Sequence, residues 1–198
     1  MPAADTTRRE RKRVHTRRRL YEAAIQLFEE KGYDPTSMDE IAELADTARA
    51  TLYNYFPRKS AFLEEWTVRR RDQVGIDLAE YRDRPTDEVI RAYLRDLVRI
   101  NIEQATLTRV LLPAWVRSGG PVEEEPYLAA ALTEYVRLGQ QRGEIRTDCD
   151  PVLVGHLIRN AYLGALYLWL HSLNDGPALD LRAAVDDSAD IILRGLST

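Results

Sequence analysis

Residues 37–59, SMDEIAELADTARATLYNYFPRK, constrain the fold more than any other stretch of this chain. Ser37 followed three residues later by Glu40 is the capping-box pattern that begins a helix. Apolar residues then recur at helical spacing and give this helix one buried face: Ile41, Leu44 and Ala45. Asp46 and Thr47 are turn formers, and they end the pattern. The stretch therefore predicts a short helix followed by a tight turn.

A second short helix is predicted after this turn, and it is rich in side chains that can hydrogen bond. Its polar and aromatic residues are Arg49, Thr51, Tyr53, Asn54 and Tyr55. Leu52 and Phe56 are assigned to the core. A short helix that presents such side chains suits the DNA major groove, where base edges offer donors and acceptors. We therefore predict a helix-turn-helix motif whose second helix lies in that groove.

The charge distribution also points to an anionic partner at the N-terminal end. The chain of 198 residues has a net charge of −4, but residues 1–71 hold 15 basic and 12 acidic residues. Residues 72–198 hold 13 basic and 20 acidic residues. An acidic chain that gathers its positive charge at one end is expected to bring that end to a polyanion.

The segment of residues 8–19, RRERKRVHTRRR, has eight basic residues and one acidic residue, Glu10. One interpretation of such a run is structural: a solvated tail or the start of a charged helix. The other is functional: an arm that contacts DNA phosphates or enters a minor groove. Its position ahead of a helix-turn-helix favours the arm. Residues 1–7 are mostly small and polar, and they are predicted to be disordered.

An amphipathic helix is predicted over residues 16–31, with Gly32 as its stop signal. The chain from residue 17 to 66 resembles the DNA-binding domain of the tetracycline-repressor (TetR) family of bacterial transcriptional regulators. The resemblance lies in three segments that occur in the right order and spacing: FEEKGY, TSMDEIAELA and TLYNYFPRKSAFL. The chain departs from the family pattern in the turn, where Asp46 replaces glycine and Ala48 replaces serine, which is the better N-cap.

The resemblance implies a set of DNA contacts in this N-terminal head. The candidates are Arg17, Thr36, Ser37, Thr47, Arg49, Ala50, Thr51, Tyr53, Asn54, Tyr55 and Lys59. Arg49, at the start of the second short helix, is suited to the O6 and N7 edge of guanine. Lys59 is expected to pair with a phosphate as a point charge. The hydroxyls of Thr36 and Ser37 are expected to hold a phosphate at the start of the first short helix.

The rest of the chain is predicted to be helical. A helix that links the head to the body is expected over about residues 60–82. Further helices are predicted at residues 86–108, 110–116, 126–142, 151–172 and 179–196. The fold class is therefore all-α, with a three-helix DNA-binding head and, as the resemblance implies, a larger helical ligand-binding and dimerisation domain. The predicted division is a basic arm at 1–15, the head at 16–60 and the helical domain at 61–198.

The predicted helix at residues 151–172 is apolar on nearly all sides, so it must be buried on all sides. We expect it to lie between its own domain and a second subunit. There it would complete a four-helix bundle with the last helix across a two-fold axis, as in the homodimers of the family. The candidate interface residues are Gly155, Leu157, Gly164, Leu168, Val185 and Ile192.

Polar and aromatic residues on the apolar helices of the body are candidates for an enclosed small-molecule site. They are Tyr93, Asn101, Trp115, Tyr127, Asn160 and Tyr162. The alternative for each of them is core packing with its polar tip satisfied inside the protein. No motif in this part of the chain names a ligand.

Several other classes of protein are disfavoured by the sequence. Cys149 is the single cysteine and there are three histidines, so neither an intrachain disulfide nor a structural zinc site is expected. A single cysteine also fits a protein of the reducing cytoplasm. No apolar run reaches the roughly 20 residues of a membrane-spanning helix, and no secretory signal is recognised. No nucleophile elbow, phosphate loop or metal cluster indicates an enzyme, and no cofactor is expected.

Together with the resemblance, these patterns predict a ligand-responsive repressor that binds a palindromic operator in double-stranded DNA as a homodimer. The half-sites would lie about one helical turn, roughly 34–36 Å, or more apart. A small-molecule effector in the body is expected to shift the linking helix and so change the separation of the two heads. The alternative is an architectural or partition DNA-binding protein that shares the head and has no small-molecule inducer.

Overall fold

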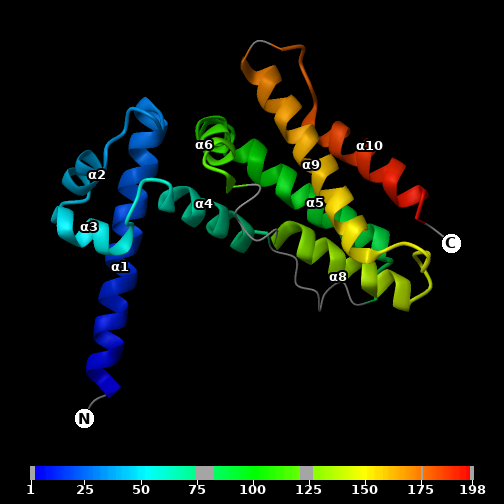
Figure 1. Ribbon diagram of the computed structural model, residues 1–198, viewed down its shortest axis with the longest axis horizontal. Coiled ribbons are helices and arrows are strands. Elements are labelled where there is room, and N and C mark those ends of the chain that lie inside the picture. Colours follow the sequence, from blue (N-terminus) through cyan, green and yellow to red (C-terminus); the bar gives the residue numbers. More distant parts are fainter. Residues whose placement is uncertain (1–2, 75–82, 121–126, 175, 197–198) are drawn as a thin grey trace. The chain divides into compact units, whose positions relative to one another are not determined.

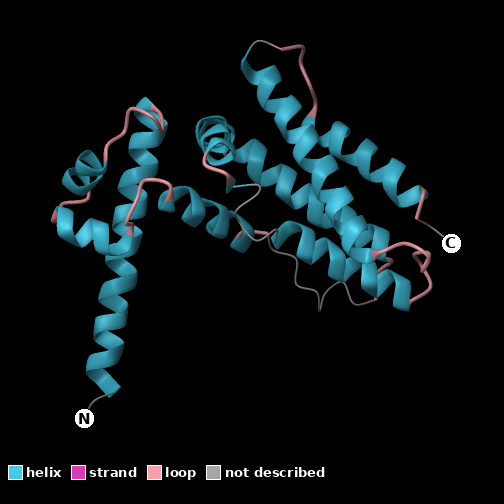
Figure 2. Cartoon of the chain, in the orientation of Figure 1, coloured by secondary structure: helices cyan, strands magenta, loops and turns pink. Residues whose placement is uncertain are grey.

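The computed structural model describes residues 3–74, 83–120, 127–174 and 176–196. Within these residues the regular elements are helices (Figure 2), which confirms the all-α prediction. They are α1 (Ala3–Lys31), α2 (Met38–Leu44), α3 (Arg49–Tyr55), α4 (Ala61–Asp72), α5 (Thr86–Glu103), α6 (Ala105–Arg117), α8 (Tyr127–Gln141), α9 (Pro151–Asn174) and α10 (Leu181–Arg194). The chain divides into two compact units, Met1–Arg71 with Gln104–Glu123 and Asp72–Glu103 with Glu124–Thr198.

The first helix is longer than the sequence indicated. It was expected over residues 16–31, but α1 begins at Ala3. The expected disorder of residues 1–7 is therefore wrong from Ala3 onward. No glycine or proline interrupts α1, and alanine, arginine, lysine and glutamate all favour a helix. The basic segment is thus part of a charged helix, and its contact with DNA stays a prediction.

An aromatic core joins α1, α3 and α4 in the first unit. Phe56, which follows α3, stacks on Phe62 of α4 with ring centroids 3.9 Å apart. Phe28 of α1 meets Phe62 edge-on at 6.2 Å. Leu20 of α1 and Leu52 of α3 are fully buried in the same unit. With α2 packed against both α1 and α3 (Figure 1), this core holds the two short helices in place.

The helix α6 belongs to the first unit, where it packs against α1. Arg70 of α4 donates a 2.9 Å hydrogen bond to the hydroxyl of Thr108 in α6. Arg117 at the end of α6 forms an ion pair of 2.8 Å with Asp34, which follows α1. Thus α6 is fastened to the helices that carry α2 and α3.

Two further departures from the predicted helix boundaries exceed a few residues. The single helix expected over residues 86–108 is broken at Gln104, which follows the last residue of α5 and stands at the N-cap position of α6 without a side-chain cap bond. No glycine or proline marks this break, so packing overrides local propensity there. The linking helix α4 ends at Asp72, and its predicted continuation enters residues 75–82, which lie outside the described residues.

The second unit consists of α5, α8, α9 and α10, and α9 packs along both α8 and α10 (Figure 1). Its core is largely aliphatic, and Ile90, Leu132 and Ile158 are buried at its centre. Two ion pairs join α5 to α10: Arg91–Asp190 at 2.9 Å and Arg95–Asp186 at 3.0 Å. None of the helices in the described part of the chain combines the length and the apolar character needed to cross a membrane.

Candidate nucleic-acid interface

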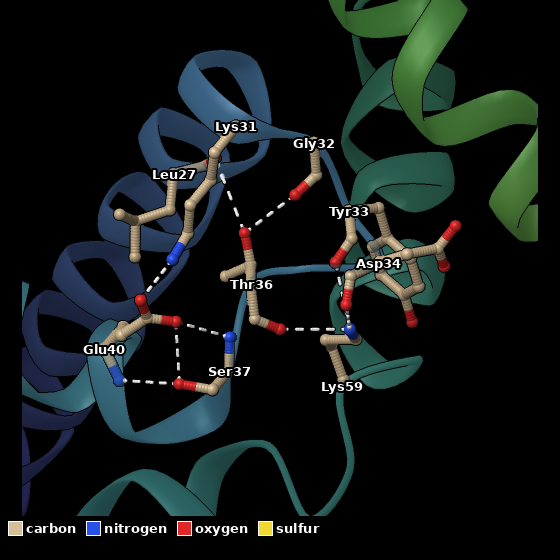
Figure 3. A network of polar contacts seen from close by, with 9 residues as sticks. All are labelled: Leu27, Lys31, Gly32, Tyr33, Asp34, Thr36, Ser37, Glu40 and Lys59. Atoms are coloured by element: carbon tan, nitrogen blue, oxygen red, sulfur yellow. Dashed lines mark hydrogen bonds and ion pairs between the residues drawn. The ribbon is translucent and has the colours of Figure 1, made fainter.

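The start of α2 is the capping box that the sequence predicted (Figure 3). The Ser37 hydroxyl accepts a bond of 3.3 Å from the Glu40 amide, and the Glu40 carboxylate accepts from the Ser37 amide at 2.8 Å. Lys31 also binds this carboxylate. The Lys31 bond and then the Ser37 amide lower the pKa of Glu40 to about 2. A carboxylate thus occupies the place where Ser37 was expected to hold a phosphate.

Thr36 and Lys59 have structural partners that the sequence did not reveal (Figure 3). Thr36 is buried, and its hydroxyl donates to the carbonyl of Gly32 at 2.8 Å. This corrects the expectation that the Thr36 hydroxyl faces a phosphate. The Lys59 ammonium donates to three carbonyls, of Tyr33 and Asp34 at 2.9 Å and of Thr36 at 3.0 Å.

The ammonium of Lys59 also lies 4.5 Å from the ring centroid of Tyr33, and burial lowers its pKa. An ammonium group has three N–H donors, so these carbonyls occupy all of them. The geometry assigns Lys59 to the loop between α1 and α2, and it corrects the expectation of a point charge presented to DNA. The acceptors are main-chain oxygens, which no residue pattern displays.

Arg17 is likewise held inside the first unit. Its guanidinium donates to the Glu65 carboxylate at 2.7 and 3.1 Å and to the carbonyl of Tyr55 at 3.1 Å. It also lies over the ring of Phe56 at 4.5 Å. Burial opposes ionisation of Glu65, but the bonds from Arg17 and Arg69 outweigh it and keep the pKa of that carboxyl below its usual value. Arg17 therefore holds the C-terminal end of α3.

The turn between α2 and α3 is closed by Arg19, which was not among the predicted site residues. Arg19 of α1 donates through Nη2 to the carbonyl oxygens of Ala45 at 2.7 Å and Asp46 at 3.0 Å. The Thr47 hydroxyl lies 2.9 Å from the same nitrogen, so the two N–H groups of Nη2 are shared among three acceptors. The predicted contact Thr47 is thus engaged within the turn. The sequence gives no sign of these bonds, because two of the three acceptors are main-chain carbonyls 26 and 27 residues away.

One face of α3 remains exposed, and it carries four of the predicted contacts: Arg49, Ala50, Tyr53 and Asn54. Thr51 and Tyr55 are half-buried at its edges, and Leu52 is in the core. The positions of the four exposed residues repeat after four, as one face of a helix requires. Among the predicted core residues of α2, Ile41 is buried but Leu44 is exposed, because it lies at the last turn of a very short helix.

Arg49 is not isolated on this face. Its guanidinium forms an ion pair of 2.6 Å with Asp39 in the first turn of α2, and both side chains are exposed. Exposed pairs of this kind contribute only about 0–1 kcal/mol, so the guanidinium exchanges partners readily. Asp39 was not among the predicted site residues.

The structure places the six candidates for a small-molecule site in different surroundings within their units. Asn101 and Tyr162 are buried and hydrogen bond to each other at 2.6 Å in the second unit. Tyr93, in the same core, meets Tyr135 edge-on at 5.5 Å. The remaining three candidates lie elsewhere: Trp115 in the first unit, and Tyr127 and Asn160 in exposed positions. Among the described residues, no group of three or more His, Cys, Asp and Glu is placed to hold a metal ion.

The predicted dimer residues separate into two groups. A Cβ on Gly155 would lie 2.4 Å from the Thr133 hydroxyl, so this glycine lets α9 approach α8 of its own chain. Val185 is buried in the core of its own chain. The prediction that Gly155 and Val185 lie in the dimer interface is therefore wrong. Ile192 is half-buried. Leu157 and Leu168 are 51% and 61% exposed.

The exposed apolar surface of α9 forms a stripe at helical spacing. It contains Leu153, Leu157, Gly164 and Leu168. A Cβ on Gly164 would meet no atom within 4 Å, so this part of α9 is open. Ile191 of α10 is 76% exposed. We call the α9 residues the exposed α9 stripe. It is the surface that the sequence predicted to be covered, and the prediction identified only some of its residues.

Comparisons with known proteins agree with the geometry of the head. Residues 20–66 match the family described as bacterial regulatory proteins, tetR family. The chain is 25% identical over 162 residues to the HTH-type transcriptional repressor KstR of Rhodococcus jostii. This alignment covers 78% of this chain and 72% of KstR. It is 26% identical over 177 residues to the A-factor receptor protein of Streptomyces griseus. That alignment covers 87% of this chain and 60% of the receptor protein.

A similar solved structure is that of Thermus thermophilus FadR, a TetR-family transcriptional repressor in complex with lauroyl-CoA. The two structures superpose with a TM-score of 0.69 at 26% identity. The alignment covers 92% of this chain and 95% of that one. The similarity therefore extends beyond the helix-turn-helix to the helices of the second unit.

Proposed function

The chain is a transcriptional regulator of the tetR family, and from this premise we propose that it is a ligand-responsive repressor that binds a palindromic operator as a homodimer. The observation that carries the proposal is the exposed face of α3, with Arg49, Ala50, Tyr53 and Asn54 side by side on a helix held at both ends. A short, rigid helix with these side chains suits the major groove. In a homodimer, two copies of it would read two half-sites.

Each exposed side chain of α3 suits a different part of the DNA. Arg49 has the fork of donors that matches guanine, and in the complex it would exchange Asp39 for a base edge. Asn54 suits an adenine edge or a phosphate, and the methyl of Ala50 suits the methyl of thymine. The hydroxyls of Thr51, Tyr53 and Tyr55 suit phosphates, which set the position of the helix. The positive charge of residues 1–15 would add contacts to the DNA backbone.

The exposed α9 stripe supports the homodimer. Leucines that stand more than half exposed on one side of a long helix are unusual unless a partner covers them. A second copy of the same chain would cover them across a two-fold axis, and α9 and α10 of both copies would form a four-helix bundle. Such a dimer would carry two heads, as a palindromic operator requires.

We propose that the effector binds in the second unit, where Tyr93, Asn101 and Tyr162 are polar or aromatic groups in a largely aliphatic core. The FadR of Thermus thermophilus was solved with lauroyl-CoA, and that ligand is a first probe for this chain. A route to the head is present in the chain itself, because α5 is followed directly by α6, which is fastened to α1 and α4. An effector that displaces the end of α5 would act on α6 and hence on the head.

The proposal is tested by isolating the operator and then titrating effectors. Genomic fragments retained by the purified protein are footprinted, and affinities are measured with and without lauroyl-CoA and a panel of small aromatic compounds. A protected palindrome that is released by a bound compound is the expected result. Binding without sequence preference and without response to any compound that binds would instead favour an architectural DNA-binding protein. We also propose that the protein acts in the cytoplasm, and the proposed function requires no catalytic chemistry.

A further inference from the structure

The turn before α3 lacks the two residue types that usually stabilise such a turn. Asp46 has a φ of +46°, in the left-handed region that glycine adopts without strain. Ala48 is the N-cap of α3, and it makes no side-chain bond to the amides of the first turn. Serine, threonine or aspartate at that position would supply such a bond. Both residues lie within the three positions before Arg49, the first residue of α3.

The main chain of the turn satisfies only part of its hydrogen-bonding capacity. The Asp46 amide donates to the carbonyl of Glu43 at 3.0 Å, and the Thr47 amide donates to that of Ala42 at 2.9 Å. These two bonds form a Schellman motif at the end of α2. The carbonyls of Ala45 and Asp46 point out of the motif. They need donors from another part of the chain or from water.

Arg19 supplies those donors from a fixed base. Its neighbour Leu20 is fully buried, so this part of α1 cannot move independently of the core. Through Nη2, Arg19 binds both carbonyls and the Thr47 hydroxyl, and that hydroxyl donates in turn to the Ala45 carbonyl at 3.0 Å. The group is a closed network at the one turn that determines where α3 begins.

We propose that Arg19 is a positioning residue of the DNA interface, which sets the orientation in which α3 presents Arg49 and its neighbours. The inference rests on the proposed function. Arg17 holds the other end of α3 through the Tyr55 carbonyl, so two arginines of α1 fix both ends of a helix of seven residues. A helix of that length spans only about 10 Å, so a shift at its first residue displaces the whole exposed face.

The test compares two replacements of Arg19 with a matched control on the same helix. Arg18 is the control, because it is exposed and pairs with Glu22 of α1 itself. Affinities for operator and for non-operator DNA are measured at one salt concentration and at a temperature where all variants are folded. We expect R19A and R19K to lose operator affinity about 10-fold, equivalent to about 1.4 kcal/mol, and to lose much less on non-operator DNA. R18A should weaken both kinds of binding alike, because it removes only a charge.

The lysine variant separates orientation from charge. A lysine keeps the positive charge, but its ammonium ends one bond short of Nη2, the nitrogen through which Arg19 makes all three bonds, so it does not reach the turn in the same way. Wild-type affinity and selectivity in R19K would show that Arg19 acts only as a charge, and this outcome overturns the proposal. Equal selectivity losses in R19A and R18A would overturn it as well.

A rescue variant and a measurement without DNA complete the test. Glycine adopts the left-handed conformation without strain, so D46G in the R19A background should restore part of the selectivity, and D46N, which also removes the charge, should restore less. Equal recovery in the two variants overturns the proposal. The Thr47 amide should exchange its hydrogen faster in R19A than in R18A. If the wild-type protein bound no operator, that result would overturn the proposed function but not the role of Arg19 in the turn. Equal exchange rates of the Thr47 amide in R19A and R18A would overturn the role of Arg19, whether or not an operator is found.

Discussion

Asn101 of α5 donates a 2.6 Å hydrogen bond to the phenol oxygen of Tyr162 of α9, and both side chains are buried in the second unit. The other N–H of the Asn101 amide donates to the carbonyl of Leu97 at 2.8 Å. The amide therefore joins α5 to α9 in a core that is otherwise mostly apolar. Each side chain was predicted to contact a ligand, and in the structure each already has the other as a partner.

Loss of either partner should destabilise the protein, and the two losses should not add. We expect N101A to lower the free energy of unfolding by about 2–3 kcal/mol, from the missing bond and the space left in the core. Y162F should lower it by about 1 kcal/mol, because it removes the phenol oxygen alone. Because both single variants remove the same hydrogen bond, the double variant should lower the free energy of unfolding by less than the sum of the two single losses. Denaturant unfolding of the four proteins measures this coupling, and strictly additive effects would contradict a direct bond.

Arg49 should carry a large part of operator selectivity. We expect R49A to weaken operator binding by about 1–3 kcal/mol and non-operator binding by less, because a bidentate contact with guanine discriminates between bases. Fluorescence anisotropy with operator and scrambled duplexes measures both. R137A is the matched control, since Arg137 is an exposed arginine of α8 paired with Glu134. A loss of the same size on both duplexes would reduce Arg49 to a phosphate contact.

The parts of the head that depend on local signals could be predicted from the sequence. The capping box of Ser37 and Glu40 and the stop at Gly32 are set by residues a few positions apart, and the structure has both. The roles of Lys59 and Thr36 could not be predicted, because their partners are carbonyl oxygens that only the folded loop brings near. The role of Arg19 could not be predicted for the same reason.

The long helix α9 shows a second limit. Its sequence is apolar all round, so hydrophobicity alone cannot tell the side that packs on its own chain from the side left exposed. Gly155 belongs to the inner side of α9, and Leu157 and Leu168 belong to the outer one. The position of α8 decides this, and that position depends on contacts distant in the sequence.

The outer side of α9 should control self-association. We expect L168D to convert a dimer into monomers without unfolding, because it places a charge in a surface that a second copy would cover. Sedimentation velocity reports the association state, and circular dichroism reports the fold. L44D provides the control, as it alters an exposed leucine of α2 in the first unit. A dimer that survives L168D would place the interface elsewhere.

The capping box should make stability depend on pH in acid. The pKa of Glu40 is about 2 in the folded chain, below its ordinary value of 4.5. A lowered pKa stabilises the fold above the unfolded value, and this contribution is lost as the pH falls from about 4.5 towards 2. We expect E40Q to be less stable than wild type at pH 7, and the difference to shrink across this interval. Thermal unfolding between pH 6 and pH 2.5, at low salt, measures it, and a constant difference would contradict the assignment.

The basic start of α1 should determine how operator binding depends on salt. Arg9, Arg11 and Lys12 are exposed on the helix, and each one that meets a phosphate releases counterions. Replacing all three with glutamine keeps a residue that favours a helix and removes the charge. We expect weaker operator binding and a slope of log K against log salt that is smaller by about 0.9 for each phosphate that the variant no longer neutralises. Affinities between 50 and 300 mM salt measure the slope. An unchanged slope with the triple variant would show that this part of α1 stays away from the DNA, and the positive charge of the first unit would then act through the residues near α3.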